Sequence, residues 1–168
     1  DSNRDVWNLV NQREWLENEL KAATEKWKIV VLHHPLYSIK GSMNNLTQRY
    51  MFNDLVQEYG VDLVLQGHDH VYMRTGVMKN NETVYTDTQY LRYNGEYYLS
   101  KIEPDGTIYT INGTAGSKHY VPKTEDEYTS YFPKAEFVME IDIPSYSHIQ
   151  VDGGNLYFDS YSVDKNGK

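Results

Sequence analysis

The chain has 168 residues, a net charge of −8 at pH 7 and a hydrophobic content of 39%, which predicts one globular domain with a packed core. The acidic balance argues against a nucleic-acid surface or an anionic-membrane surface. The sequence contains no cysteine, which excludes disulfides and thiolate metal ligands, and no apolar run reaches the about 18 residues of a membrane-spanning helix.

The first predicted element is a helix over residues 11–27. Asn11 and Glu14 have the spacing of a capping box, which predicts that the helix begins at Asn11. Four apolar residues recur at helical spacing and predict one buried face: Leu16, Leu20, Ala23 and Trp27.

A strand, a second helix and a second strand follow. Residues 28–35 form a short β-branched run that Pro35 ends. The next helix is predicted over residues 46–60, with Gly60 after its last turn, and the second strand over residues 61–67. Both strands are almost continuously apolar, which favours a parallel sheet covered on both faces, so residues 11–67 predict a parallel βαβ arrangement.

Four histidines follow the ends of these two strands. His33 and His34 end the first strand, and His68 and His70 come directly after the second. Because the carboxyl ends of parallel strands meet at one edge of a sheet, three or four imidazoles are expected to converge there. Neutral imidazoles bind Zn, Fe or Mn, so the pattern predicts a metal site. The alternative is a set of surface or core histidines without a metal.

The remainder of the chain predicts mostly antiparallel strands separated by turns. Residues 79–106 are predicted to be an inserted hairpin or loop region, and residues 117–134 a long surface loop. The composition is unusual, with 16 tyrosines and 4 phenylalanines. We interpret this tyrosine excess as a half-exposed β surface, in which the ring packs and the hydroxyl stays in water, or as a surface that binds a sugar or an aromatic group.

Two blocks of sequence resemble a known family. "VVLH", which ends at His33, and "GHDH" at residues 67–70 resemble the calcineurin-like metallophosphoesterases, in the purple-acid-phosphatase-like branch. The flanking stretches "HHPLYS" and "HVYMRT" resemble the same branch. The resemblance is dense over residues 12–75 and looser after residue 107. It implies an α/β fold that is part of a four-layer α/β/β/α sandwich. Residues 1–168 would form a single domain, in which residues 79–106, the tyrosine-rich segment, would be an insertion.

The resemblance also implies roles for individual residues. His33, His68 and His70 match ligands of a two-metal centre whose ions are Fe, Zn or Mn. A turn could direct the two histidines of a His-x-His motif to two ions about 3.5–4 Å apart. His34 stands at a variable position, where it would orient a ligand or face the substrate. The implied substrate is a phosphate ester.

Other residues near these blocks are expected to have supporting or surface roles. Asp69 is expected to be solvated rather than a ligand. Tyr72 and Arg74 are expected to brace the loop. His119 is expected to be a loop histidine or to reach the site from the other side, and His148 an exposed strand residue.

Part of the family's pattern is absent. The sequence has no Gly-Asp pair and no Gly-Asn-His block, both of which precede the two blocks found here in the family. We therefore expect the chain to be the C-terminal portion of its domain, to require a missing N-terminal half for turnover, and to leave a sheet edge through which it could dimerise. An extracellular or cell-envelope location is expected. The alternative is a non-catalytic module that binds a glycan or a protein and retains relic ligands.

Overall fold

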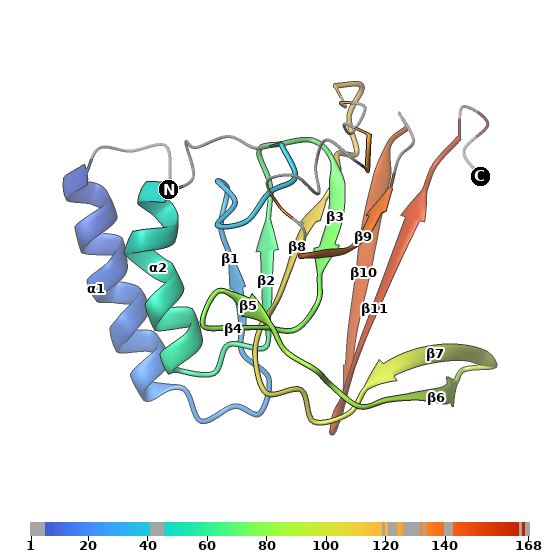
Figure 1. The fold of residues 1–168 in the computed structure, drawn as a ribbon, viewed down its shortest axis with the longest axis horizontal. Coiled ribbons are helices and arrows are strands. Elements are labelled where there is room, and N and C mark those ends of the chain that lie inside the picture. Colours follow the sequence, from blue (N-terminus) through green and yellow to red (C-terminus); the bar gives the residue numbers. More distant parts are fainter. Residues whose placement is uncertain are drawn as a thin grey trace.

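The computed structural model describes residues 6–40, 46–118, 120, 124–125, 132, 134–139, 143–164 and 166. Figure 1 shows two helices beside a twisted sheet, with β-hairpins on the far side and at the base. Within these residues, no helix is both long enough and apolar enough to span a bilayer. Most of the predicted loop at 117–134 lies outside the described residues.

The first helix differs from its prediction at both ends. Helix α1 spans Val6–Ala22 and places Asn11 in its middle. Leu9 is buried in the core, so packing of the first turns extends the helix beyond the capping-box pattern. Trp27 lies after the helix, where its indole N–H donates to the carbonyl of Gly153, 3.2 Å away. The prediction of a helix over residues 11–27 was therefore wrong in its boundaries, although its existence is confirmed.

Helix α2, Leu46–Glu58, follows its prediction closely. Phe52, Leu55 and Val56 are buried on the face that packs into the core. Gly60 has φ +61°, and the N–H of Val61 donates to the carbonyl of Val56 across it, as in a helix that ends with a glycine.

Five strands form the central sheet. Their order is β1-β2-β8-β3-β9, and the bounds are Ile29–Val31 for β1, Leu63–Gln66 for β2, Ile108–Asn112 for β8, Tyr72–Thr75 for β3 and Ala135–Met139 for β9. Strands β1, β2 and β8 are parallel, whereas β3 is antiparallel to both β8 and β9. The prediction of a parallel βαβ part followed by mostly antiparallel strands is confirmed.

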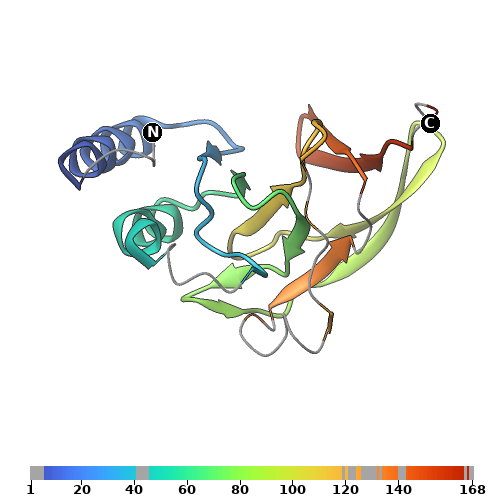
Figure 2. The same cartoon turned by 90° about the horizontal axis from the view of Figure 1, so that it is seen from above.

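Different elements pack on the two faces of the sheet. The side chain of Tyr109 meets α2 on one face, where its hydroxyl donates to Asn53. The hairpin of β10, Ser145–Asp152, and β11, Asn155–Ser162, covers the other face, where Ser160 donates to the hydroxyl of Tyr72. Figure 2 shows α2 and this hairpin on opposite sides of the sheet. The described residues therefore form one helical layer and two β layers, which agrees with part of an α/β/β/α sandwich.

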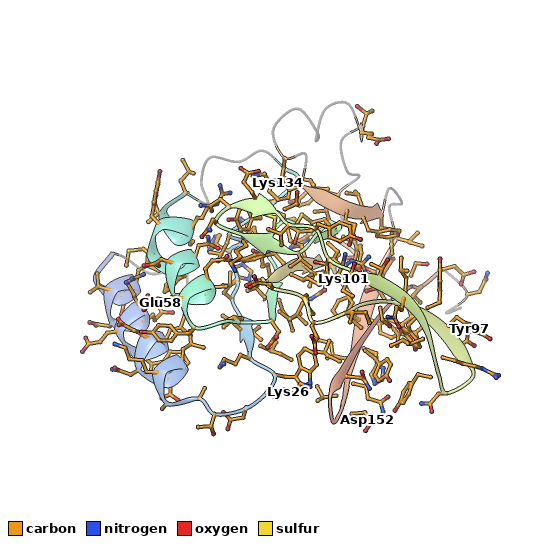
Figure 3. The ribbon with its side chains drawn as sticks, turned by 60° about the horizontal axis from the view of Figure 1, so that its bottom comes forward. Lys26, Glu58, Tyr97, Lys101, Lys134 and Asp152 are labelled. Atoms are coloured by element: carbon orange, nitrogen blue, oxygen red, sulfur yellow. The ribbon has the colours of Figure 1, made fainter. Side chains whose placement is uncertain are left out.

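The tyrosine-rich segment forms two antiparallel hairpins. The first pairs β4, Met78–Lys79, with β5, Glu82–Thr83, and the second pairs β6, Thr88–Tyr93, with β7, Glu96–Lys101. The ring of Tyr93 stacks on Tyr157 of β11 with 3.9 Å between centroids. Figure 3 shows Lys101 near the body of the molecule and Tyr97 toward the free end. One face of the second hairpin thus packs on the C-terminal hairpin.

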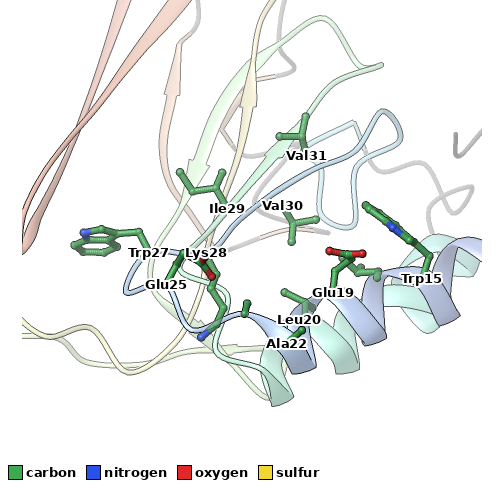
Figure 4. Close-up of a pocket in the computed structure, with 12 residues that line it drawn as sticks. Trp15, Glu19, Leu20, Ala22, Glu25, Trp27, Lys28, Ile29, Val30 and Val31 are labelled. Atoms are coloured by element: carbon green, nitrogen blue, oxygen red, sulfur yellow. The ribbon is translucent and has the colours of Figure 1, made fainter.

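Strand β1 is an edge of the central sheet, and its outer side is open. Val30 packs into the core, whereas Ile29 and Val31 are 37% and 73% exposed. A groove of about 460 Å³ runs between β1 and α1, with Trp15 on its helical wall (Figure 4). A strand whose backbone and apolar side chains both face solvent is a surface that can pair with further polypeptide.

We predict that Tyr109→Phe lowers the free energy of unfolding by about 1–3 kcal/mol. The Tyr109 hydroxyl is fully buried, donates to Asn53 at 2.6 Å and accepts from Gln57 at 2.9 Å, so its removal leaves both amides without this partner. Urea unfolding measures the change, with Tyr50→Phe, at an 80% exposed ring, as the control. Equal stability of the two variants would contradict the prediction.

Candidate metal centre

Parallel pairing of β1 with β2 brings the two histidine-bearing segments together. The pairing continues past β1, because the N–H of Leu32 donates to the carbonyl of Leu65 at 3.0 Å. One residue further on, the N–H of Gly67 donates to the carbonyl of His33, also at 3.0 Å. The backbone of His33 is thereby held directly beside the start of the second histidine segment.

The segment after β2 turns sharply at both of its histidines. His68 has φ 69° and His70 has φ 52°, values in the left-handed region that residues other than glycine seldom adopt. The N–H of Asp69 donates to the carbonyl of Gly67 at 2.8 Å and tightens the turn. This turn keeps the two imidazoles from projecting as they would along an extended strand.

Three imidazoles form one cluster at this edge of the sheet. Nδ1 of His68 lies 3.2 Å from Nε2 of His33. The His34 ring lies 4.2 Å from the His68 ring and 5.1 Å from the His33 ring, measured between centroids. One nitrogen from each of the three rings lies within 4.8 Å of the others, so the predicted convergence of three imidazoles is present.

The geometry of this cluster fits a metal ion. Two nitrogens bound to one ion at about 2.0–2.1 Å with a tetrahedral angle are about 3.3 Å apart. The 3.2 Å between His68 Nδ1 and His33 Nε2 is close to this separation. Imidazole is also the ligand type that Zn and Fe accept. Within the part of the chain that the structure describes, the cluster contains no carboxylate.

His34 and His70 occupy different surroundings from those expected. His34 is half-buried and belongs to the cluster, with its ring centroid 4.2 Å from that of His68. His70 is absent from the cluster among the described residues. The metal-binding roles of His33, His68 and His70, and the supporting role of His34, stay predictions.

His70 is held by a segment that is distant in sequence. Its Nδ1 donates to the carbonyl of Lys118, and its carbonyl accepts from the N–H of Tyr120 at 3.2 Å. The ammonium of Lys40 lies 3.9 Å from the centroid of the Tyr120 ring, beside His70. The bond to Lys118 fixes the tautomer of a neutral His70, because a carbonyl only accepts, and leaves Nε2 as the ring's acceptor atom. Metal-binding histidines are commonly oriented in this way.

The prediction that Asp69 is solvated was wrong. Asp69 is only 4% exposed, and its carboxylate accepts a hydrogen bond from the hydroxyl of Ser38, which is 9% exposed. Tyr72 accepts a hydrogen bond from Ser160 and so links the sheet to β11, whereas Arg74 pairs at 3.5 Å with Glu136 of the neighbouring strand β9 within the sheet. His148 is exposed on β10 as predicted.

His119 lies outside the described residues, and its prediction is untested.

Gln66 is a structural residue that the sequence analysis missed. It ends β2 and is buried, and its Oε1 accepts from the N–H of Leu36 at 2.6 Å and of Tyr37 at 3.2 Å. Its Nε2 donates to the carbonyl of Tyr37 at 3.2 Å. The available signal was a polar residue at the end of the apolar run "VDLVLQ". Gln66 therefore ties the segment after His34 to the strand that carries His68.

Comparison with known proteins gives concordant matches. Residues 1–72 match a family model described as calcineurin-like phosphoesterase. Human acid phosphatase type 7 is 25% identical over 180 residues, which cover 95% of this chain and 37% of that protein. Fe(3+)-Zn(2+) purple acid phosphatase 12 of Arabidopsis thaliana is 36% identical over 74 residues, covering 41% of this chain and 16% of that protein.

A solved structure shares the fold. The purple acid phosphatase PPD1 from yellow lupin, Lupinus luteus, superposes with a TM-score of 0.62 at 22% identity. The match covers 90% of this chain and 26% of that chain. This chain thus spans well under half the length of the relatives that it matches.

We predict that Gln66→Leu lowers the free energy of unfolding by about 2–3 kcal/mol, because it leaves buried backbone groups of Leu36 and Tyr37 unpaired. Chemical denaturation measures this change. The control is Gln89→Leu, at an exposed position of β6. If Gln66→Leu were as stable as the control, the hydrogen bonds of Gln66 to Leu36 and Tyr37 would not be needed to hold the segment after His34.

Proposed function

We propose that the chain, whose residues 1–72 match the calcineurin-like phosphoesterase model, is a member of that family and that its histidines are part of a two-metal centre that hydrolyses phosphate esters. The observation that carries the proposal is the 3.2 Å between His68 Nδ1 and His33 Nε2 at the carboxyl ends of two parallel strands. Ligands in such sheets gather at this edge.

The histidines would bind different ions of this centre. His33 and His68 would hold one ion together, and His70, oriented by the carbonyl of Lys118, would serve the other. His34 stands against His68, where it would support the ligand geometry or contact the substrate. Ions such as Fe, Zn or Mn would neutralise the phosphate oxygens and lower the pKa of water.

The donor set within the described residues is incomplete for two cations. Three neutral imidazoles supply no negative charge, whereas a pair of metal ions requires carboxylates to balance it. We propose that the remaining ligands come from polypeptide that pairs with the open edge of β1 and fills the groove beside Trp15. By itself the chain would bind one ion and show negligible turnover. An extracellular or cell-envelope location is part of the same proposal.

A second candidate function rests on the exposed face of the β6–β7 hairpin. Tyr90, Tyr97 and Leu99 are 73%, 70% and 61% exposed and share one face of the pairing. Arg92 lies over the Tyr97 ring on that face. Exposed tyrosine rings with nearby donors suit stacking against a sugar. A module that binds glycans would lose binding in Tyr97→Ser and keep it in His68→Ala.

We predict that the purified chain binds about one equivalent of Zn²⁺, as the cluster holds the ligands for one ion. His33→Ala or His68→Ala should weaken binding at least about tenfold, since each removes a nitrogen donor. Element-resolved analysis after dialysis, with a competing chelator, measures stoichiometry and affinity. His148→Ala, at an exposed histidine of β10, is the matched control. A folded wild-type chain without metal, or equal loss in His148→Ala, would contradict the proposal.

We also predict that hydrolysis of p-nitrophenyl phosphate by this chain stays at background with Mn²⁺, Zn²⁺ or Fe added. The reason is that the histidine cluster contains no carboxylate donor among the described residues. Colour release over hours measures it. Robust turnover that disappears in His68→Ala would show that residues 1–168 suffice for catalysis and would overturn the part of the proposal that concerns β1.

A further inference from the structure

We infer that Ser38 and Asp69 are positioning residues whose hydrogen bond clasps the two histidine-bearing segments together. Ser38 lies five residues after His33, and Asp69 directly follows His68. The role of this hydrogen bond in metal binding rests on the function proposed above. The bond itself is a property of the described residues and can be tested without metal.

The direction of this hydrogen bond is fixed by its neighbours. The backbone N–H of Lys40 donates to Oγ of Ser38 at 3.1 Å. The one proton of the Ser38 hydroxyl is then directed to the carboxylate of Asp69, which only accepts when ionised. Ser38 therefore links the backbone after β1 to the turn after β2.

Burial gives this contact its importance. Asp69 is 4% exposed and Ser38 is 9% exposed, although both side chains belong to a surface turn region. Burying a carboxylate costs several kcal/mol unless hydrogen bonds compensate for the lost water, and aspartate is seldom buried without a partner. An aspartate with no role at this position would turn to solvent. Its inward orientation thus depends on the hydroxyl that it meets.

The clasp controls the direction of His68. Asp69 stands between two residues in the left-handed conformation, His68 and His70, so the backbone curves sharply on both sides of the buried carboxylate. The two segments are fastened at three places: Gln66 to Leu36, Gly67 to His33, and Asp69 to Ser38. The first two lie on the strand side of His68. Only the third of these lies beyond it and ties the far end of the turn to the segment after β1, while the bonds of His70 tie that end to Lys118 and Tyr120.

The histidine separation follows from these constraints. With both ends of the turn held, His68 Nδ1 lies 3.2 Å from His33 Nε2. A preorganised pair of donors binds metal more tightly than donors that must first be ordered. Loss of the clasp is therefore expected to weaken metal binding even though neither residue is a ligand.

The test compares Ser38→Ala and Asp69→Ala with a matched control. Thr107→Val removes another buried hydroxyl, which donates to the carbonyl of Val61 at 2.6 Å at the opposite end of the sheet. Two readouts are used on the full chain. The first is the imidazole ¹H–¹⁵N spectrum without metal, and the second is the affinity for Co²⁺ followed by visible absorption.

We expect resolved imidazole signals in the wild type and in Thr107→Val, and averaged signals for His33 and His68 in Ser38→Ala and Asp69→Ala. Affinity for Co²⁺ should fall about tenfold in each of these two variants and no further in the double variant, since both changes remove the same bond. Ser38→Ala keeps the charge of Asp69, and Asp69→Asn keeps an acceptor oxygen and should restore most of the affinity.

Ser38→Ala with the spectrum and affinity of Thr107→Val would overturn the inference. Additive losses in the double variant would also overturn it, because they would show that the residues act separately. A folded wild type that does not bind Co²⁺ would refute the metal-binding proposal instead, and the metal-free spectra would still decide whether the clasp orders the histidines.

Discussion

The register of β1 against β2 is the constraint on which the site depends. Val31 pairs with Leu65, and this alignment places His33 beside Gly67 at the end of both strands. A shift by one residue would turn Val30 out of the core and separate the imidazoles. The packing of the apolar strand residues against α2 therefore fixes the chemistry at the far end of the sheet.

A three-residue strand cannot by itself hold a long segment in place. After β1 the backbone makes few hydrogen bonds to a neighbouring strand, and hydrogen bonds with side chains hold it in place instead. Gln66 binds the N–H groups of Leu36 and Tyr37, and Ser38 meets Asp69. Each of these bonds buries polar atoms, so each is costly to break. The result is an ordered cluster of histidines in a region that has little regular secondary structure.

The two edges of the central sheet differ in a way that bears on function. Strand β9 forms one edge, and Lys101 of the β6–β7 hairpin pairs with its Glu136 at 2.7 Å. Strand β1 forms the other edge, with Val31 exposed and a groove beside Trp15. The histidine cluster follows the end of this open strand. Polypeptide that added to β1 would consequently place its own strand end next to His33, where carboxylate ligands are lacking among the described residues.

The sequence by itself determined the βαβ order, the parallel direction of β1 and β2, and the meeting of histidines at their ends. These features follow from long apolar runs and from the geometry of parallel sheets, which local patterns report well. The local sequence pattern predicted the wrong ends for α1, because tertiary contacts outweighed it. Burial of Leu9 stabilises helical turns before Asn11, and Trp27 lies after the helix, where it donates to Gly153.

Only the tertiary structure decided the surroundings of each side chain. His70 is oriented by Lys118, 48 residues further along the chain, and Asp69 is buried by Ser38, 31 residues before it. Nothing within a few residues of either position encodes these partners, because a hydrogen bond between distant segments exists only after the sheet has brought them together.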